Sequence, residues 1–212
     1  MDEYTAPEFE RSALVTIDTQ KCTLDGEPFE VPGTNEVVPK ISALTAAFRA
    51  ARRPVVHVIR LYLPDGSNAE RCRRKQLLAG AKLALVGSEG RMPASDILPP
   101  GIVNLDDSRL LRGEMLEVGP SEWVMYKPRW GAFYRTKLEH HLHDLQVSTV
   151  VLCGCNYPNC PRTTLYEGSE RDFRLAAISD AISRLTDNGA SELHGIGVAL
   201  FDTESCIRSL QR

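Results

Sequence analysis

Residues 147–164 read VSTVVLCGCNYPNCPRTT, and this stretch decides the fold. Its first part, VSTVVLC, is mostly apolar and is typical of a strand buried on both faces of a sheet. Gly154 ends the strand, and a polar loop leads to Cys160. A proline directly after this cysteine suits the first turn of a helix, which we expect over about 159–172. The stretch therefore predicts one strand-and-helix unit of a parallel sheet.

The same alternation of apolar runs and helical periodicity continues along the chain. We expect further strands over 13–17, 55–59, 122–126 and 175–179, and helices over about 34–52, 67–79, 132–145 and 188–201. Thr34 or Asn35 is the expected cap of the first helix. Alternation of apolar strands with helices predicts a three-layer α/β fold, with a mainly parallel, Rossmann-like sheet covered by helices on both faces. We expect one domain over 1–212, with residues 1–11 as an N-terminal arm.

The composition excludes several classes of protein. The chain has 212 residues, 42% of them hydrophobic, and a formal net charge of −3, which argues against a nucleic-acid partner. No apolar run approaches the roughly 20 residues needed to span a bilayer, and the acidic N-terminus does not resemble a secretory signal. We therefore expect a cytoplasmic protein with no membrane partner, whose six cysteines are free thiols.

Three reactive side chains follow predicted strands. Asp18 comes after the first strand, Lys127 after the third, and Cys160 after the fourth. Because ligands of such folds bind at the carboxyl ends of the strands, these side chains are candidates for one site. The helix N-terminus and Lys127 would favour a nucleophilic thiolate at Cys160, with Asp18 as its base. Each residue alone also has an ordinary interpretation, as a buried cysteine, a loop-binding aspartate or a surface lysine.

Together, three stretches resemble the isochorismatase-like cysteine hydrolase family. They are LVTIDTQ at 14–20, YKPRWGAF at 126–133 and VVLCGCNYPNC at 150–160. Thr164 and the pair Asp180-Ala181 also fit. The resemblance extends over about 13–197 and implies the isochorismatase-like hydrolase fold. The Gly-Cys-Asn-Tyr-Pro-Asn-Cys-Pro-Arg loop is similar to a sub-branch whose members mostly have undefined substrates.

The resemblance implies a mechanism and assigns roles to residues. Cys160 would be the nucleophile, Asp18 the base and Lys127 the assisting cation, so that a C–N bond of a small amide or carbamoyl compound is cleaved through a thioester. The N–H groups of Asn156 and Cys160 would form the oxyanion hole, with a non-proline cis peptide between Cys155 and Asn156. The family also implies a homo-oligomer.

Differences from other members of the family restrict the class of substrate that we expect. Nicotinamidases of the family bind a metal through an Asp-x-His pair and a further His. Residues 57–65 here read HVIRLYLPD, and no His lies between 58 and 139. We therefore expect neither a metal nor another cofactor. Isochorismatases proper cleave a vinyl ether and lack the cysteine, so Cys160 favours an amidohydrolase.

Candidates for substrate binding follow from position. They are Arg129, Trp130, Tyr157, Arg162 and Arg60, although structural ion pairs and core packing are the commoner roles of such residues. An arginine could pair with a substrate carboxylate. The basic run at 71–75 is interpreted as a solvated helix face. The spacing of Cys153, Cys155 and Cys160 is not that of a zinc site.

Other functions remain open at this point. The chain could be a vinyl-ether hydrolase of the isochorismatase type, or a catalytically silent binding member of the same fold. A thiol redox protein would need Cys155 as the partner of Cys160, without a Cys-x-x-Cys motif. The sequence does not name the substrate.

Overall fold

The computed structural model describes residues 2–27 and 29–211, so Met1, Pro28 and Arg212 lie outside the described residues. The strands are β1 (Ser12–Ile17), β2 (Val55–Ile59), β3 (Leu116–Gly119), β4 (Glu122–Tyr126), β5 (Thr149–Gly154), β6 (Arg174–Ile182) and β7 (Ala199–Phe201). The α-helices are α1 (Thr34–Ala50), α2 (Arg71–Leu78), α3 (Asp107–Leu111), α4 (Leu138–Asp144), α5 (Cys160–Ser169), α6 (Asp187–Gly195) and α7 (Thr203–Leu210). Short 3-10 helices cover Phe9–Arg11, Lys21–Thr23, Glu89–Arg91 and Ser95–Ile97.

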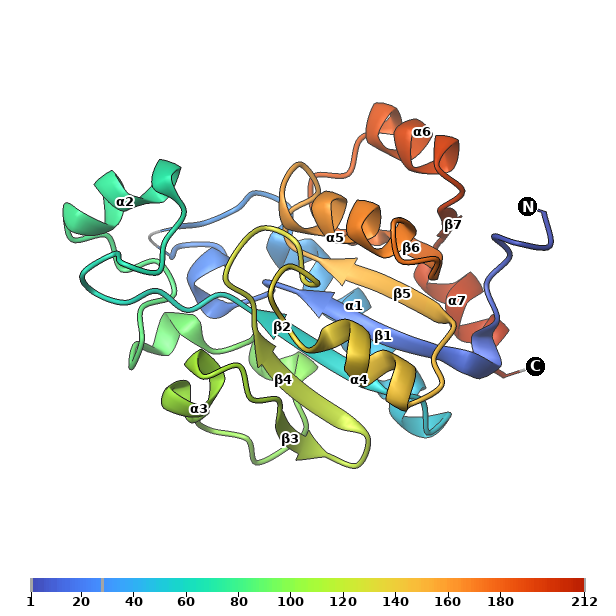
Figure 1. Cartoon of the computed structure of the whole chain (residues 1–212), viewed down its shortest axis with the longest axis horizontal. Helices are drawn as coiled ribbons and strands as arrows, with labels where there is room; N and C mark the ends of the chain where they lie inside the picture. The colour runs from blue at the N-terminus through green and yellow to red at the C-terminus, as the bar shows by residue number, and fades with distance from the viewer. Residues whose placement is uncertain (1, 28, 212) are drawn as a thin grey trace.

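The strands form one seven-stranded sheet in the order β3-β4-β2-β1-β5-β6-β7 (Figure 1). Every neighbouring pair is parallel except β3 and β4, which are antiparallel at one edge. The predicted α/β fold class is confirmed. Because β1 lies in the middle, between β2 and β5, its carboxyl end is next to those of both neighbours.

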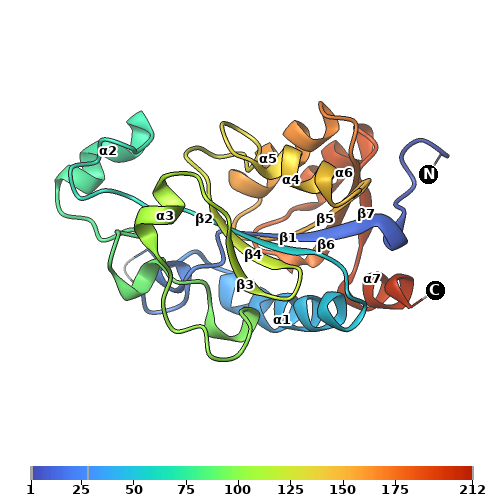
Figure 2. The same ribbon diagram turned by 60° about the horizontal axis from the view of Figure 1, so that its bottom comes forward.

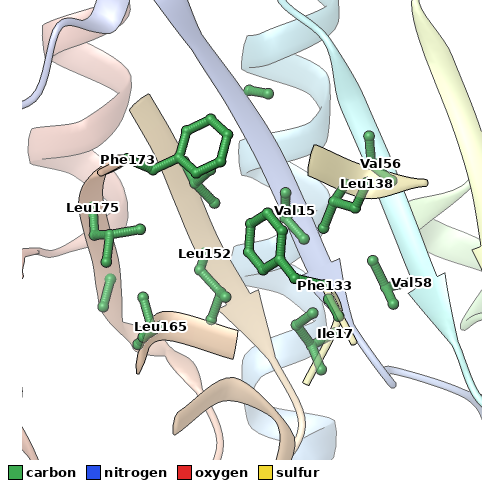
Figure 3. Close-up of a cluster of buried hydrophobic side chains, with 14 of the residues drawn as sticks. Val15, Ile17, Val56, Val58, Phe133, Leu138, Leu152, Leu165, Phe173 and Leu175 are labelled. Atoms are coloured by element: carbon green, nitrogen blue, oxygen red, sulfur yellow. The ribbon is translucent and has the colours of Figure 1, made fainter. Parts of the chain in front are cut away.

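Helices cover both faces of the sheet, with α1 and α7 on one side and α4, α5 and α6 on the other (Figure 2). Side chains of β1 alternate between the two faces, as expected for a strand. Val15 and Ile17 pack beneath α4 and α5 in the larger core (Figure 3), whereas Leu14 packs against α1. Both faces of β1 are apolar and buried, which explains its nearly continuous apolar sequence.

Two predicted helices differ from the structure at their starts. The helix expected over 132–145 begins only at Leu138. The backbone N–H of Ala132 donates to Thr164 Oγ1, and that of Phe133 donates to Glu167, so contacts with α5 hold this segment as turns. In α1 the capping position is taken by Gly33, at φ 85°, without a side-chain cap, so the expected cap by Thr34 or Asn35 is wrong.

The helix predicted over 188–201 is confirmed in its first part, as α6, but it ends at Gly195. Gly197, at φ 81°, follows α6, and the chain then enters the short strand β7. Helix α7 comes next, with the side chain of Asp202 accepting the N–H of Ser205 at its start. Strand β3 and helix α3 were not predicted either, whereas α2 lies inside the expected 67–79.

The N-terminal arm packs on the domain. Arg174 donates to the backbone oxygens of Glu3 and Ala6, at 2.7 Å and 2.8 Å, and the N–H of Glu8 donates to Thr149 Oγ1. Among the described residues, no helix is both long and apolar enough to cross a membrane.

Candidate active site

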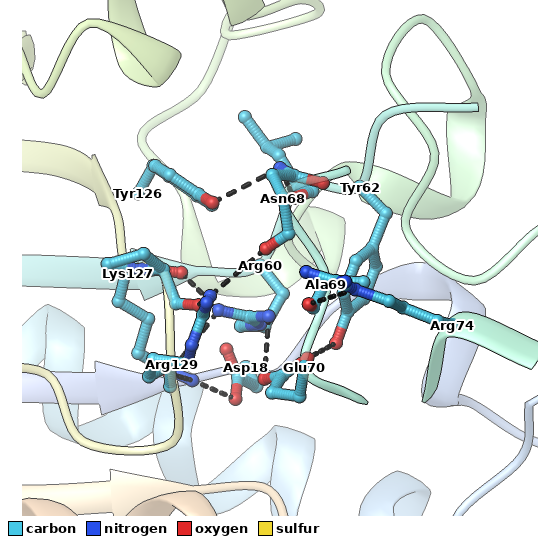
Figure 4. A network of polar contacts seen from close by, with 12 residues as sticks. Asp18, Arg60, Tyr62, Asn68, Ala69, Glu70, Arg74, Tyr126, Lys127 and Arg129 are labelled. Atoms are coloured by element: carbon cyan, nitrogen blue, oxygen red, sulfur yellow. Dashed lines mark hydrogen bonds and ion pairs between the residues drawn. The ribbon is translucent and has the colours of Figure 1, made fainter. Parts of the chain in front are cut away.

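Asp18 and Lys127 meet at the carboxyl edge of the sheet. Asp18 directly follows β1, and Lys127 directly follows β4. The Nζ atom of Lys127 lies 2.8 Å from Oδ2 of Asp18 (Figure 4). The Lys127 side chain is fully buried, and it also donates to the backbone oxygen of Arg129 at 3.2 Å. A buried ammonium is thereby balanced by one carboxylate, and the other oxygen of that carboxylate, Oδ1, has no hydrogen-bond partner among the described residues.

Cys160 reaches the same point through the loop after β5. The N–H of Cys155 donates to the carbonyl of Ile17 at 2.7 Å, which ties the start of this loop to the end of β1. Gly154 makes the close approach possible, because a Cβ atom there would lie 2.2 Å from the Ile17 oxygen. Cys160 is the first residue of α5, with a proline next to it, as predicted. Its thiol lies close enough to Asp18 and Lys127 for both to act on its pKa.

Burial raises the pKa of the Cys160 thiol to about 12. The charge of Asp18 contributes to this increase, and the ammonium of Lys127 offsets only part of it. Lys127 favours the thiolate, as expected, but loss of hydration outweighs its effect. Burial therefore favours the neutral thiol beside the Asp18–Lys127 ion pair.

The thiol opens into a cavity with a volume of about 290 Å³. This volume is at the small end of the range for ligand pockets. The polar and charged residues of its lining are Asp18, Gln20, Thr23, Glu30, Arg60, Tyr62, Arg73, Asn156 and Asn159. Its apolar and sulfur-containing residues are Cys22, Phe29, Val31, Leu83, Ala84, Trp130, Cys155 and Cys160. The cavity thus combines the reactive groups with room for a small molecule.

Two backbone N–H groups next to the thiol are free. Within the described residues, those of Asn156 and Cys160 have no hydrogen-bond acceptor, whereas the N–H groups of Cys155, Tyr157 and Asn159 all have one. The described chain contains no cis peptide bond, so the peptide between Cys155 and Asn156 is trans and the expected cis bond is absent. The free donors at the start of α5 are suited to binding a negative oxygen.

Of the five substrate-binding candidates, Arg60 and Trp130 line the cavity. Arg60 is held rigidly: Nη2 lies 2.7 Å from Glu70, Nη1 donates to the Lys127 carbonyl at 2.5 Å, and the guanidinium lies over the Tyr62 ring (Figure 4). Glu70 also accepts a hydrogen bond from the Tyr62 hydroxyl at 2.9 Å. Arg60 is thus a wall of the cavity whose charge is already balanced.

The other three candidates do not line the cavity. Arg129 is turned toward the backbone oxygens of Asn68 and Pro128. Tyr157 is buried in the core, where its hydroxyl donates to the Gly189 carbonyl at 2.9 Å. Arg162 pairs with Glu192 at 2.9 Å on the outer side of α5. Each is engaged by protein groups outside the cavity lining.

Gln20 and Arg73 line the cavity but were not predicted. Gln20 bonds both the N–H and the carbonyl of Arg60, each at 2.9 Å, and so fixes the end of β2 to the loop after β1. Its place in the family-like stretch 14–20 was the available signal. Arg73 belongs to the basic run that was interpreted as a solvated face. Only the packing of α2 over the cavity distinguishes it from its neighbours.

Cys153, Cys155 and Cys160 do not form a cluster. Cys153 packs in the core on the α1 side of the sheet, Cys155 lies beside the Thr34 hydroxyl, and Cys160 packs on the opposite face from Cys153. Over residues 2–27 and 29–211, no three His, Cys, Asp or Glu side chains gather in a way that could hold a metal ion. His57 lies inside the sheet, between Thr16 and Glu122.

Comparison with known proteins identifies relatives over most of the chain. The family model of the Isochorismatase domain matches residues 102–197. The isochorismatase family protein YecD of Escherichia coli O157:H7 is 30% identical over 174 residues, covering 81% of this chain and 79% of that protein. The chain belongs to the isochorismatase family. The family predicted from the sequence is thereby confirmed.

Further similar proteins have other names. Ureidoacrylate amidohydrolase RutB of Methylobacterium radiotolerans is 27% identical over 209 residues, covering 90% of this chain and 72% of that protein. The crystal structure of an isochorismatase family protein from Desulfovibrio vulgaris is similar with a TM-score of 0.79 and 28% identity, over 95% of this chain and 99% of that one. A cysteine hydrolase from Pseudomonas syringae shares the fold, with a TM-score of 0.77 and 20% identity over 97% and 94% of the two chains.

Proposed function

We propose that this protein is a cysteine amidohydrolase that cleaves a non-peptide C–N bond of a small molecule through a thioester. The observation that carries the proposal is the meeting of Cys160 with the buried Asp18–Lys127 ion pair at the floor of a cavity. Membership of a family that contains amidohydrolases supports the same reaction class. Because burial raises the pKa of the thiol, the nucleophile forms as the substrate reacts.

The reaction begins with attack and proton transfer together. The sulfur of Cys160 bonds to the carbonyl carbon of the substrate while its proton passes to Asp18, whose Oδ1 atom is free to accept it. The pKa of the thiol, about 12, disfavours ionisation in advance of attack. Lys127 stays beside the carboxyl group and holds it in place.

The negative oxygen formed by attack needs donors. The free N–H groups of Asn156 and Cys160 are the candidates, aided by the positive end of the α5 dipole. The tetrahedral intermediate then collapses: the C–N bond breaks, Asp18 returns its proton to the leaving nitrogen, and ammonia or an amine departs. Asp18 next takes a proton from water, whose oxygen attacks the thioester carbon; the C–S bond breaks, the acid is released, and Asp18 passes the proton to the sulfur of Cys160.

A panel of small amides, ureido compounds and carbamoyl compounds, scored for released ammonia, tests the proposal. We expect wild type to hydrolyse at least one class, and Cys160→Ala and Asp18→Asn to fold but to lose the activity. The matched control is Cys206→Ala, because Cys206 is buried on the opposite face of the sheet. If Cys160→Ala retained full turnover, covalent catalysis would be excluded. If wild type bound such compounds but hydrolysed none, the silent binding member would be the better description.

A further inference from the structure

Not every charge that faces the cavity has a partner. Asp18 is paired with Lys127 at 2.8 Å, and Arg60 with Glu70 at 2.7 Å. Burial raises the pKa of Cys22 to about 12 and also raises that of Tyr62, so neither supplies a negative charge near neutral pH. Two charged residues of the lining remain, Glu30 and Arg73. They form no ion pair with each other in the described chain.

Glu30 is exposed and accepts the N–H of Gly26 at 3.0 Å, so it belongs to the outer rim. Arg73 is half-buried, and its Nε atom is fully buried without a hydrogen-bond partner among the described residues. No described carboxylate pairs with it. The Nε donor is thus desolvated with no acceptor among the described residues, which is costly unless a ligand supplies one.

The position of Arg73 is fixed by its surroundings. Its guanidinium carbon lies 5.2 Å from the centre of the Trp130 ring, which is another wall of the cavity. The backbone N–H of Arg73 donates to the backbone carbonyl of Glu70 at 3.0 Å. The side chain of Glu70 is held in turn by Arg60 and Tyr62. Stacking on an aromatic ring orients the planar guanidinium while leaving its N–H edge free for a carboxylate.

We propose that Arg73, oriented by Trp130, binds a carboxylate of the substrate, so that the molecule cleaved at Cys160 is a small amide or carbamoyl compound with a free acid group. The inference rests on the proposed function, because it names the substrate class of the same site. The neighbouring cations Arg71, Arg74 and Lys75 are exposed and absent from the cavity lining, so they do not share this role.

Alkylation of Cys160 tests the anion site without requiring turnover. Iodoacetate and iodoacetamide have the same leaving group and nearly the same size, but only iodoacetate has a carboxylate. The rate of each reaction at Cys160 is measured by peptide mass spectrometry at pH 9, and the ratio of the two rates is compared with that for free glutathione. We expect the ratio in wild type to exceed that of glutathione by about tenfold or more, since charge-assisted hydrogen bonds typically contribute factors of this size.

Variants distinguish the effect of Arg73 on this ratio from the effect of the general positive charge of α2. Arg73→Gln should remove most of the preference for iodoacetate, and Arg73→Lys should retain part of it. Arg71→Gln, which removes the same charge from an exposed position of the same helix, should leave the ratio unchanged. No preference in wild type, or a preference that survives in Arg73→Gln, would overturn the inference.

A comparison of acids with their methyl esters tests whether the proposed carboxylate site at Arg73 contributes to catalysis. N-carbamoylglycine and its methyl ester, and succinamate and its methyl ester, are compared by ammonia release. We expect kcat/KM of wild type to favour the acids by about 10–100-fold, mainly through KM, and Arg73→Gln to bring the two close together. Equal use of acids and esters by wild type would contradict the inference. If no compound of either kind were hydrolysed while the alkylation ratio still depended on Arg73, the hydrolase function would be wrong and the anion site would stand.

Discussion

The Lys127 ammonium and the Asp18 carboxylate form an ion pair of 2.8 Å that is almost entirely withdrawn from solvent. Removing one partner of such a pair leaves an uncompensated buried charge, which typically costs about 3–5 kcal/mol. We expect Lys127→Met to lower the free energy of unfolding by about this amount and to abolish activity. The double variant Asp18→Asn/Lys127→Met should recover much of the stability and none of the activity. Urea denaturation and ammonia release measure the two effects, and additive losses of stability would contradict the pairing.

Gly154 gives a second prediction, because its backbone has φ 125° and no room for a Cβ next to Ile17. Gly154→Ala should force β5 and β1 apart at the point where the nucleophile loop begins, with a loss of several kcal/mol and of activity. The control is Gly26→Ala: φ there is 76°, but a Cβ would have nothing within 4 Å, so a loss of about 1 kcal/mol is expected. Thermal unfolding measures the stability of both variants. Equal losses in Gly154→Ala and Gly26→Ala would contradict this account.

The third prediction concerns the pH dependence of Cys160 alkylation. Since burial raises the pKa of this thiol to about 12, its reaction with neutral iodoacetamide should be slow at pH 7 and rise about tenfold per pH unit up to pH 10. Exposed Cys72 should be labelled first at pH 7. A rate at Cys160 that is fast and independent of pH above 7 would mean that a resting thiolate exists after all.

His57 gives a prediction about stability in acid. Burial lowers its pKa despite the hydrogen bond to Glu122, so the folded protein disfavours protonation of this ring. The unfolded chain protonates the ring below about pH 6.5, so it binds more protons than the folded state and stability falls with pH. Between pH 7 and pH 5 the loss from this group is up to about 2 kcal/mol. The drop in the unfolding free energy should be smaller in His57→Gln, and an equal drop in both proteins would rule out this role.

The sequence predicted the central strands well because each is a short apolar run whose neighbours are polar or turn residues. Val55–Ile59 and Glu122–Tyr126 were predicted with their observed bounds. Asp18, Lys127 and Cys160 could be identified because each follows such a run, and parallel strands bring their carboxyl ends together.

What the sequence could not predict depends on contacts between distant residues. The pKa of Cys160 is set by burial, and no local pattern reports burial. Arg73 lies over the cavity because Glu70, three residues earlier, is tied to Arg60, and nothing in the basic run distinguishes it from exposed Arg71. Arg162 could be placed correctly only by finding Glu192 on another helix.

The most direct test of the central claim is to trap the covalent intermediate. Wild type is mixed with the best compound of the ammonia-release panel, quenched in acid during turnover and digested, and the peptide that contains Cys160 is weighed. The account predicts that its mass increases by the acyl group of the substrate, that hydroxylamine removes the addition, and that Cys160→Ala shows none. Turnover at the full rate with no addition on Cys160, and retained in Cys160→Ala, would contradict it.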